Sequence, residues 1–228
     1  MIKNKFEKII NRVFHHNNEQ LPSFLMHQLF HSGKYLPYTS SSLKMKHLCA
    51  VLNNICIHNR KNIMEFGSGI STIIMARLMK LNEIQGFIIS IDESDEWQKI
   101  IASYLEDEGL SDFVAFVHAP TEKSSDMENA FEYNREKVFQ TLNDKKFDLI
   151  LIDGPSAWNN SNKMSRLTNF EFIENNLAEH FTIFLDNADR PGEMALSEKI
   201  TSKLGIKSTK IDSTFVAFKK GKHFNFVI

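Results

Sequence analysis

The sequence NIMEFGSGIST at residues 62–72 joins a short apolar run to a turn that contains two glycines. Gly67 and Gly69 can adopt positive φ angles and let a ligand approach the main chain, and the helical pattern that follows offers free N–H groups. A dinucleotide-binding turn would carry a third glycine where Thr72 stands, and a phosphate-binding loop would carry a lysine after the second glycine. The turn therefore favours a nucleoside ligand without a phosphate. A bare strand-to-helix turn is the alternative for this motif taken alone.

From residue 61 onwards, short apolar runs alternate with longer helical patterns. Such runs are typical of strands that helices bury on both faces of a parallel sheet. The expected strands are NIMEF, GFIISI, FVAFV, FDLILI and FTIFL, and the expected helices cover 71–81, 94–108, 126–142, 163–178 and 191–204. The last segment, IKSTKIDSTFVAFKK, places two strand-like pieces around DS and predicts an antiparallel hairpin. The pattern predicts an α/β, Rossmann-like, doubly wound sheet of seven mostly parallel strands.

The N-terminal region has a different texture, with apolar residues recurring every three or four positions. We expect residues 1–58 to form a helical cap region over the ligand pocket and residues 59–228 to form the binding domain, both within one structural unit. The stretch YTSSS at 38–42 is a candidate ligand contact. The histidines of this region show no metal-ligand spacing; they are His15, His16, His27, His31, His47 and His58.

The composition is that of an ordinary soluble globular protein. The 228 residues are 42% hydrophobic and 24% charged, and the net charge of −1 favours neither nucleic acid nor an anionic membrane as a partner. Cys49 and Cys56 lie two helical turns apart, about 10 Å, which is too far for a disulfide. Two free thiols, no signal peptide and no apolar run long enough for a membrane span predict a cytoplasmic protein.

An acidic residue closes the second expected strand. FIISID ends in Asp92, 27 residues after Glu65, with Glu93 beside it and Trp97 in the first turn of the next helix. An acid at this position accepts ribose hydroxyls in dinucleotide folds, and an indole can stack on a base. A surface cluster of acids at a helix N-terminus is the alternative, because helix dipoles favour Asp and Glu there.

The E-x-G-x-G turn, the strand ending in an acid and the closing hairpin resemble class I S-adenosylmethionine-dependent methyltransferases over about residues 60–220. The resemblance implies S-adenosylmethionine as the cofactor, with its methionine part on the turn and its ribose on Asp92 and Glu93. His118 stands where many members carry an acid for the adenine, and Trp97 is a further candidate contact for the base. The implied contacts on the turn are Glu65, Gly67, Ser68, Gly69, Ser71 and Thr72.

Two further strand ends carry oxygen ligands. FDLILI leads into Asp153, and FTIFL leads into Asp186 and Asn187. Carboxylate and amide oxygens suit Mg²⁺, Mn²⁺ or Ca²⁺, and a bound cation lowers the pKa of an acceptor hydroxyl. This pattern resembles the metal-dependent O-methyltransferases of the catechol and caffeoyl-CoA types, which implies that these three residues hold the metal and that Asp153 also meets the cofactor and the reacting groups. A turn-forming Asp-Gly and a helix cap are the alternatives.

The acceptor and the catalytic base are less defined by sequence. Ser156 stands where the catechol enzymes carry a lysine base, so Lys163 and Arg166 are the candidates for this role. IDGPS, DNADRPGE and SIDESDEW also resemble bacterial methyltransferases that modify glycans. That resemblance implies a sugar hydroxyl or uronic acid as acceptor, with Arg166 and Arg190 facing its negative charge.

We therefore expect divalent-cation-assisted O-methylation of a small molecule or saccharide, without nucleic-acid or membrane partners. The alternatives are a metal-independent N- or O-methyltransferase, an inactive cofactor-binding scaffold or partner subunit, and a nicotinamide-dependent oxidoreductase that the missing third glycine disfavours. The polar segment 119–135, with Tyr133, is either a lid or a solvated loop. The 19 phenylalanines also suit a homodimer interface.

Overall fold

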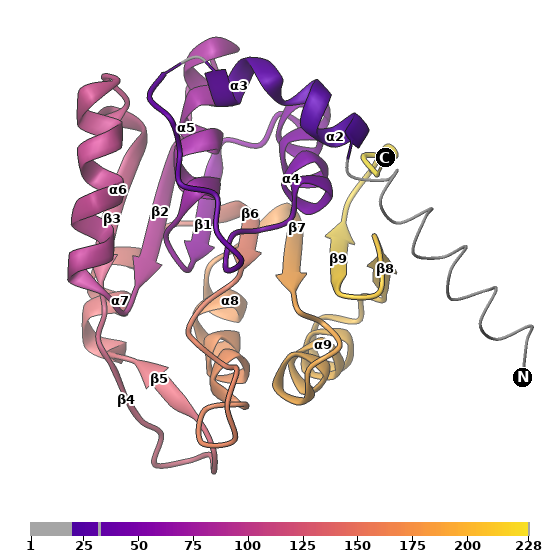
Figure 1. Cartoon of the computed structure of the whole chain (residues 1–228). Helices are drawn as coiled ribbons and strands as arrows, with labels where there is room; N and C mark the ends of the chain where they lie inside the picture. Colours follow the sequence, from indigo (N-terminus) through magenta and orange to yellow (C-terminus); the bar gives the residue numbers. More distant parts are fainter. Residues whose placement is uncertain (1–19, 32, 228) are drawn as a thin grey trace, which may run out of the picture.

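A seven-stranded sheet forms the centre of the molecule (Figure 1), and the computed structural model describes residues 20–31 and 33–227. Its order is β3-β2-β1-β6-β7-β9-β8. The first five strands are parallel, whereas β9 is antiparallel to both β7 and β8, which confirms the predicted sheet and its closing hairpin. The strands are β1 Asn62–Phe66, β2 Phe87–Asp92, β3 Val114–His118, β6 Phe147–Ile152, β7 Leu177–Asp186, β8 Ser208–Lys210 and β9 Phe215–Lys220.

Both faces of the sheet are buried, because successive residues of each strand point into two different cores. Ile63 joins the core beneath α4, α5 and α6, whereas Met64 joins the core beneath α7, α8 and α9. This alternation of apolar residues on both faces is the reason for the continuous apolar runs in the sequence. The helices are α4 Met45–His58, α5 Ile70–Leu81, α6 Asp95–Asp107, α7 Arg135–Leu142, α8 Phe170–Asn175 and α9 Pro191–Leu204.

The predicted helical N-terminal region is only partly helical. Residues 1–19 lie outside the described residues, and two short helices, α2 Gln20–Leu25 and α3 His27–His31, precede α4. Residues 33–44 are not helical but form an irregular strap, which Figure 1 shows crossing in front of the sheet. A glycine, a proline and a run of hydroxyl residues explain this correction, since all of them favour turns over helix interiors.

Buried Arg77 of α5 fixes the first part of the strap. Its guanidinium donates to the carbonyl oxygens of Leu29 (2.6 Å) and Lys34 (3.1 Å) and pairs with the carboxylate of Glu108 (2.5 Å). At the other end, the Nζ atom of Lys44 donates to the hydroxyl of Thr214 at 3.1 Å. The strap is thus attached to the domain at both ends.

The segment after β3 also departs from the prediction. Residues expected to begin a helix at 126 form part of a two-stranded hairpin instead, β4 Thr121–Lys123 with β5 Phe131–Tyr133, so the helix begins only at Arg135. The hairpin packs on the 3-10 helix η2 Ser165–Asn169, where the amide of Phe131 donates to the hydroxyl of Ser165 at 2.8 Å. A second 3-10 helix, η1 Ser111–Phe113, precedes β3.

The topology brings the predicted site residues to one edge of the sheet. Strand β1 lies between β2 and β6, so the strand order reverses on either side of it, and ligands bind at such switch points. The glycine turn and the acids at 92, 153 and 186 follow β1, β2, β6 and β7 at their carboxyl ends. Within the described residues, we find no helix with the length and apolar character needed to cross a membrane.

Candidate active site

A cavity of about 540 Å³ opens at the carboxyl ends of the parallel strands. Its wall has two parts, which we call the glycine flank (residues 67–73 and 92–97) and the acid flank (residues 153–158, Arg166 and 186–190). Hydroxyl-bearing residues of the strap, Thr39, Ser40, Ser41 and Ser42, together with Lys44 complete the wall, so the predicted YTSSS stretch does border the cavity.

The glycine turn brings main chain directly against the cavity. Gly67 has a φ of +95°, and a Cβ atom there would lie 3.0 Å from the amide nitrogen of Gly154, so a larger residue would be strained and crowded. Gly69 is extended, and a Cβ atom there would meet nothing within 4 Å. A side chain at 69 would instead project into space that a ligand needs.

Glu65 lies beneath this turn and does not line the cavity. Its buried carboxylate accepts hydrogen bonds from the hydroxyls of Ser71 (2.5 Å), Thr72 (2.5 Å) and Ser90 (2.8 Å). Burial raises the pKa of Glu65 to about 7, although these three hydrogen bonds oppose the rise. Of this set only Ser71 reaches the cavity wall, so Glu65 and Thr72 shape the turn from below.

Asp92 lines the cavity beside the turn and is held by main-chain amides. Its carboxylate accepts from the N–H of Ser68 at 2.7 Å and of Ser94 at 2.8 Å, while burial raises its pKa. Trp97 is fixed by a 2.7 Å hydrogen bond from its indole nitrogen to the Ser68 carbonyl oxygen. Glu93 accepts from the hydroxyl of Ser156 at 2.5 Å and so connects the two flanks.

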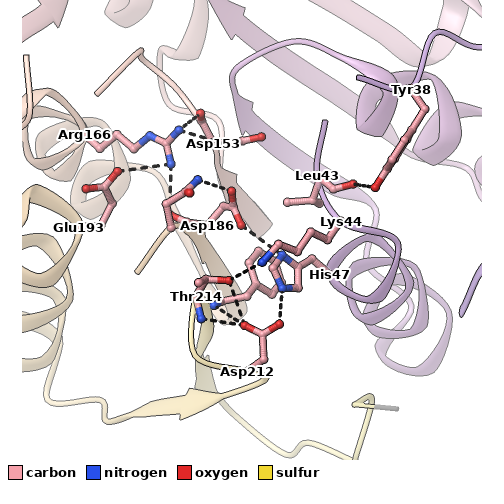
Figure 2. Close-up of polar contacts among 12 residues, drawn as sticks. Tyr38, Leu43, Lys44, His47, Asp153, Arg166, Asp186, Glu193, Asp212 and Thr214 are labelled. Atoms are coloured by element: carbon pink, nitrogen blue, oxygen red, sulfur yellow. Dashed lines mark hydrogen bonds and ion pairs between the residues drawn. The ribbon is translucent and has the colours of Figure 1, made fainter. Parts of the chain in front are cut away.

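The acid flank gathers Asp153, Asp186 and Asn187 on one wall, although they come from two different strand ends. Arg166 of η2 lies behind them (Figure 2). Its guanidinium donates to Oδ1 of Asp153 at 3.1 Å and to the carbonyl oxygen of Asp186 at 3.1 Å. Burial raises the pKa of Asp153 to about 7 against the opposing charge of Arg166, and the neighbouring Asp186 carboxylate adds to the rise.

Asp186 has partners on both carboxylate oxygens. Oδ1 lies 3.1 Å from Nδ1 of His47, and Oδ2 accepts from the side-chain amide of Asn187. The other ring nitrogen of His47, Nε2, lies 2.6 Å from Oδ2 of Asp212 in the turn between β8 and β9. Neither His47 nor Asp212 was predicted, because they come from sequence positions 139 and 26 residues away from Asp186 and carry no motif.

The donor set fits a hard divalent cation in chemical type. Two neighbouring carboxylates repel each other unless a proton or a cation lies between them, and Asn187 can supply an amide oxygen if its amide group is turned over. Across residues 20–31 and 33–227, however, no three His, Cys, Asp or Glu side chains are grouped to hold a metal. A cation at this position would be held by two carboxylates, Asp153 and Asp186, and by the amide oxygen of Asn187, which is not one of those four residue types.

The two residues predicted as candidate bases, Lys163 and Arg166, differ in where they lie. Lys163 does not line the cavity. Arg166 does, but an arginine side chain stays protonated in proteins, and its N–H groups bind Asp153, Pro155 and Asp186. The structure therefore gives Arg166 the position of a fixed cation. His118, at the end of β3, pairs in register with Asp92 and is also absent from the cavity wall.

Three more residues border the cavity, and of these only Trp158 was not singled out from the sequence. The side chain of Tyr133, from the β4–β5 hairpin, is buried against Gly154, where a Cβ atom would come within 2.5 Å of the phenol oxygen. Trp158 is the last residue of the 153–158 loop and is 75% exposed at the cavity mouth. Arg190 also borders the cavity. Together they show that the hairpin and the 153–158 loop belong to the site.

Comparison with known proteins identifies the family. A family model described as a methyltransferase domain matches residues 64–188. A comparison with curated proteins returned no match. Among solved structures, an O-methyltransferase from Bacillus cereus in complex with SAH has a TM-score of 0.58 at 19% identity, with 90% of each chain covered.

Two further solved structures show the same fold. A Staphylococcus aureus protein described as a caffeoyl-CoA O-methyltransferase has a TM-score of 0.58 at 16% identity and covers 94% of this chain and 98% of its own. TomG, an O-methyltransferase from Streptomyces achromogenes in complex with SAM, has a TM-score of 0.57 at 14% identity, with 90% and 98% covered. Because the family model spans more than half of the sequence, the chain belongs to this methyltransferase domain family.

Proposed function

We propose that this protein transfers a methyl group from S-adenosylmethionine to a hydroxyl oxygen of a small molecule or saccharide, assisted by a divalent cation. One observation carries the proposal: a single cavity has an open glycine turn with Asp92 on one flank and Asp153, Asp186 and Asn187 on the other. A donor and an acceptor bound on these two flanks would meet inside the same cavity.

The glycine flank suits the cofactor. Free N–H groups at the start of α5 and the open space at Gly69 leave room for the methionine part. The Asp92 carboxylate accepts two main-chain hydrogen bonds and, with about four lone pairs, retains capacity for ribose hydroxyls. In support, TomG and the Bacillus cereus enzyme were crystallised with SAM and SAH respectively.

The acid flank suits the acceptor. When bound, a divalent ion would lower the pKa of the acceptor hydroxyl and orient its oxygen. Asp153, Asp186 and the Asn187 amide would hold that ion, while Arg166 keeps Asp153 in place from behind. The exposed ring of Trp158 offers a flat surface at the cavity mouth for a phenolic or sugar ring, and Arg190 offers a positive charge for an acidic one.

Calorimetry is the first test. We expect the purified chain to bind S-adenosylmethionine and S-adenosylhomocysteine in the micromolar range and to show no heat with NAD. A panel of catechols, phenolic acids, sugars, sugar nucleotides and uronic acids is then assayed with methyl-labelled cofactor in Mg²⁺, Mn²⁺ or EDTA. Absence of any adenosyl-compound binding would overturn the proposal.

A metal-independent transfer is the second candidate, and a specific observation favours it. Arg166 and His47 already place a hydrogen-bonding partner on each of the two acids, Asp153 and Asp186. Methyl transfer that continues at full rate in EDTA would establish this candidate and remove the cation from the proposal.

A further inference from the structure

His47 is a fully buried polar side chain next to the acid flank. It projects from α4, its side chain has no exposed surface, and its ring stacks on Phe215 with centroids 4.2 Å apart and planes 5° from parallel. Its two nitrogens face two carboxylates, Asp186 at 3.1 Å and Asp212 at 2.6 Å (Figure 2). The ring therefore lies as a bridge between two acids.

The two carboxylate contacts of His47 set the number of N–H donors that its ring needs. An ionised carboxylate only accepts hydrogen bonds, and a neutral imidazole has a single N–H group. Two carboxylate partners are both satisfied only when each ring nitrogen carries a proton. With both nitrogens protonated, the ring of His47 is a rigid donor that carries one N–H group at each end.

Asp212 fixes the far end of the bridge. Its Oδ1 atom accepts from the amide nitrogens of Thr214 at 2.8 Å and Phe215 at 3.0 Å, so the turn between β8 and β9 sets its position. Its other oxygen faces His47. Because the anchor is main chain, the imidazole cannot shift without breaking the turn or leaving Phe215.

At the other end of the bridge, His47 contacts the Asp186 carboxylate and affects its orientation. Asp153 is a neighbouring carboxylate, and repulsion between the two acids would turn Asp186 away from the cavity. The contact with Nδ1 of His47 opposes that rotation. Removing the donor would leave the Asp186 side chain with Asn187 and the neighbouring Asp153 carboxyl as its partners.

We propose that His47 is a positioning residue: anchored by Asp212, it holds the Asp186 carboxylate in place at the cavity wall and makes α4 part of the acid flank. The geometric claim stands on these contacts alone. Its consequence for cation binding rests on the proposed function.

The test uses two substitutions at 47 and matched controls. His47→Phe keeps an aromatic ring to stack on Phe215 but removes both N–H groups, whereas His47→Gln keeps a donor for one carboxylate. The controls are the same two changes at His58, the last residue of α4, whose ring packs against Phe224 and lies away from the cavity. Crystal structures with S-adenosylhomocysteine, cofactor affinity and Mn²⁺ affinity are measured for each.

We expect Asp186 to adopt a different rotamer in the His47→Phe chain and Mn²⁺ affinity to fall at least tenfold, roughly the effect of removing an outer partner of a metal ligand. Affinity for S-adenosylhomocysteine should stay within threefold. His47→Gln should recover part of the Mn²⁺ affinity, and both changes at His58 should leave all three measurements as in the parent chain.

An unchanged Asp186 rotamer in both His47 variants would overturn the proposal, as would equal losses of Mn²⁺ affinity at 47 and 58. If His47→Phe does not fold, His47→Gln decides by the same structural comparison. A parent chain that binds the cofactor but no Mn²⁺ would remove the cation from the proposed function, while the orientation of Asp186 in the variants would still decide the role of His47.

Discussion

The two flanks of the cavity are built in opposite ways. The glycine flank comes from about thirty consecutive residues, and its shape depends on hydroxyl and main-chain hydrogen bonds around Glu65 and Asp92. The acid flank follows β6 and β7 and includes Arg166 of η2, and charged side chains connect it to α4 and to the β8–β9 turn. A local motif thus forms the proposed cofactor site, and long-range ion pairs form the proposed chemical site.

The largest expected effect tests whether catalysis of methyl transfer depends on the acid flank alone. Asp153→Ala should lower kcat on the order of 1,000-fold, because it removes a cavity carboxylate and one of the two carboxylates that pair with Arg166. The Kd for S-adenosylmethionine should change less than threefold. Full turnover in this variant, measured with methyl-labelled cofactor, would contradict the assignment of catalysis to the acid flank and of cofactor binding to the glycine flank.

The next effect concerns the stability of the glycine flank. Glu65 has a pKa of about 7 in the folded chain, above its ordinary value of 4.5, so the folded state binds its proton more tightly than the unfolded state does. Its contribution to the free energy of unfolding therefore falls as pH rises from 4.5 to 7, by up to roughly 3 kcal/mol. Urea unfolding of the parent and of Glu65→Gln at pH 5 and pH 7.5 should show a larger fall in the parent, because the raised pKa of Asp153 contributes to the fall in both chains. Equal pH dependence in both chains would contradict it.

A smaller effect isolates cofactor binding. Asp92→Asn should raise the Kd for S-adenosylmethionine about 10-fold, since a carboxylate oxygen that accepts from main-chain amides and ribose hydroxyls becomes an amide donor. Titration calorimetry measures the change, with Glu93→Gln as the neighbouring control. If Asp92→Asn leaves the Kd unaltered, the ribose does not bind at this strand end.

The smallest effect tests the prediction from the sequence that Lys163 is the catalytic base. Lys163→Ala should leave kcat within about twofold, because Lys163 does not line the cavity and surface substitutions rarely matter more than that. The same assay on methyl transfer measures it. A hundredfold loss would restore Lys163 as the base and would require the 159–164 loop to move over the acid flank.

The sequence predicted what depends on local pattern. The alternation of strands and helices, the glycine turn and the acids at the strand ends all follow from residues close in the chain. The structure places Asp92, Asp153, Asp186 and Asn187 around one cavity. The strap at 33–44 was misread as helix because apolar spacing continues on both sides of it.

What the sequence did not reveal depends on long-range contact. His47 meets Asp186 and Asp212 only after the sheet has brought β7 and β9 together, and a lone histidine in an amphipathic helix resembles any core residue. The sequence predicts Arg166 as a candidate base, whereas its guanidinium donates hydrogen bonds to three carbonyl and carboxylate groups in the folded loop. These contacts cannot be read from the sequence.

The bridge through His47 bears on how this family can be rearranged by recombination. The matched region, residues 64–188, holds the cofactor motif and the acids, whereas the bridging His47 and its anchor Asp212 lie outside it. A segment exchanged at the borders of the match would carry Asp186 without these two residues. An exchange that keeps the contacts of Asp186 would have to include helix α4 and the closing hairpin as well.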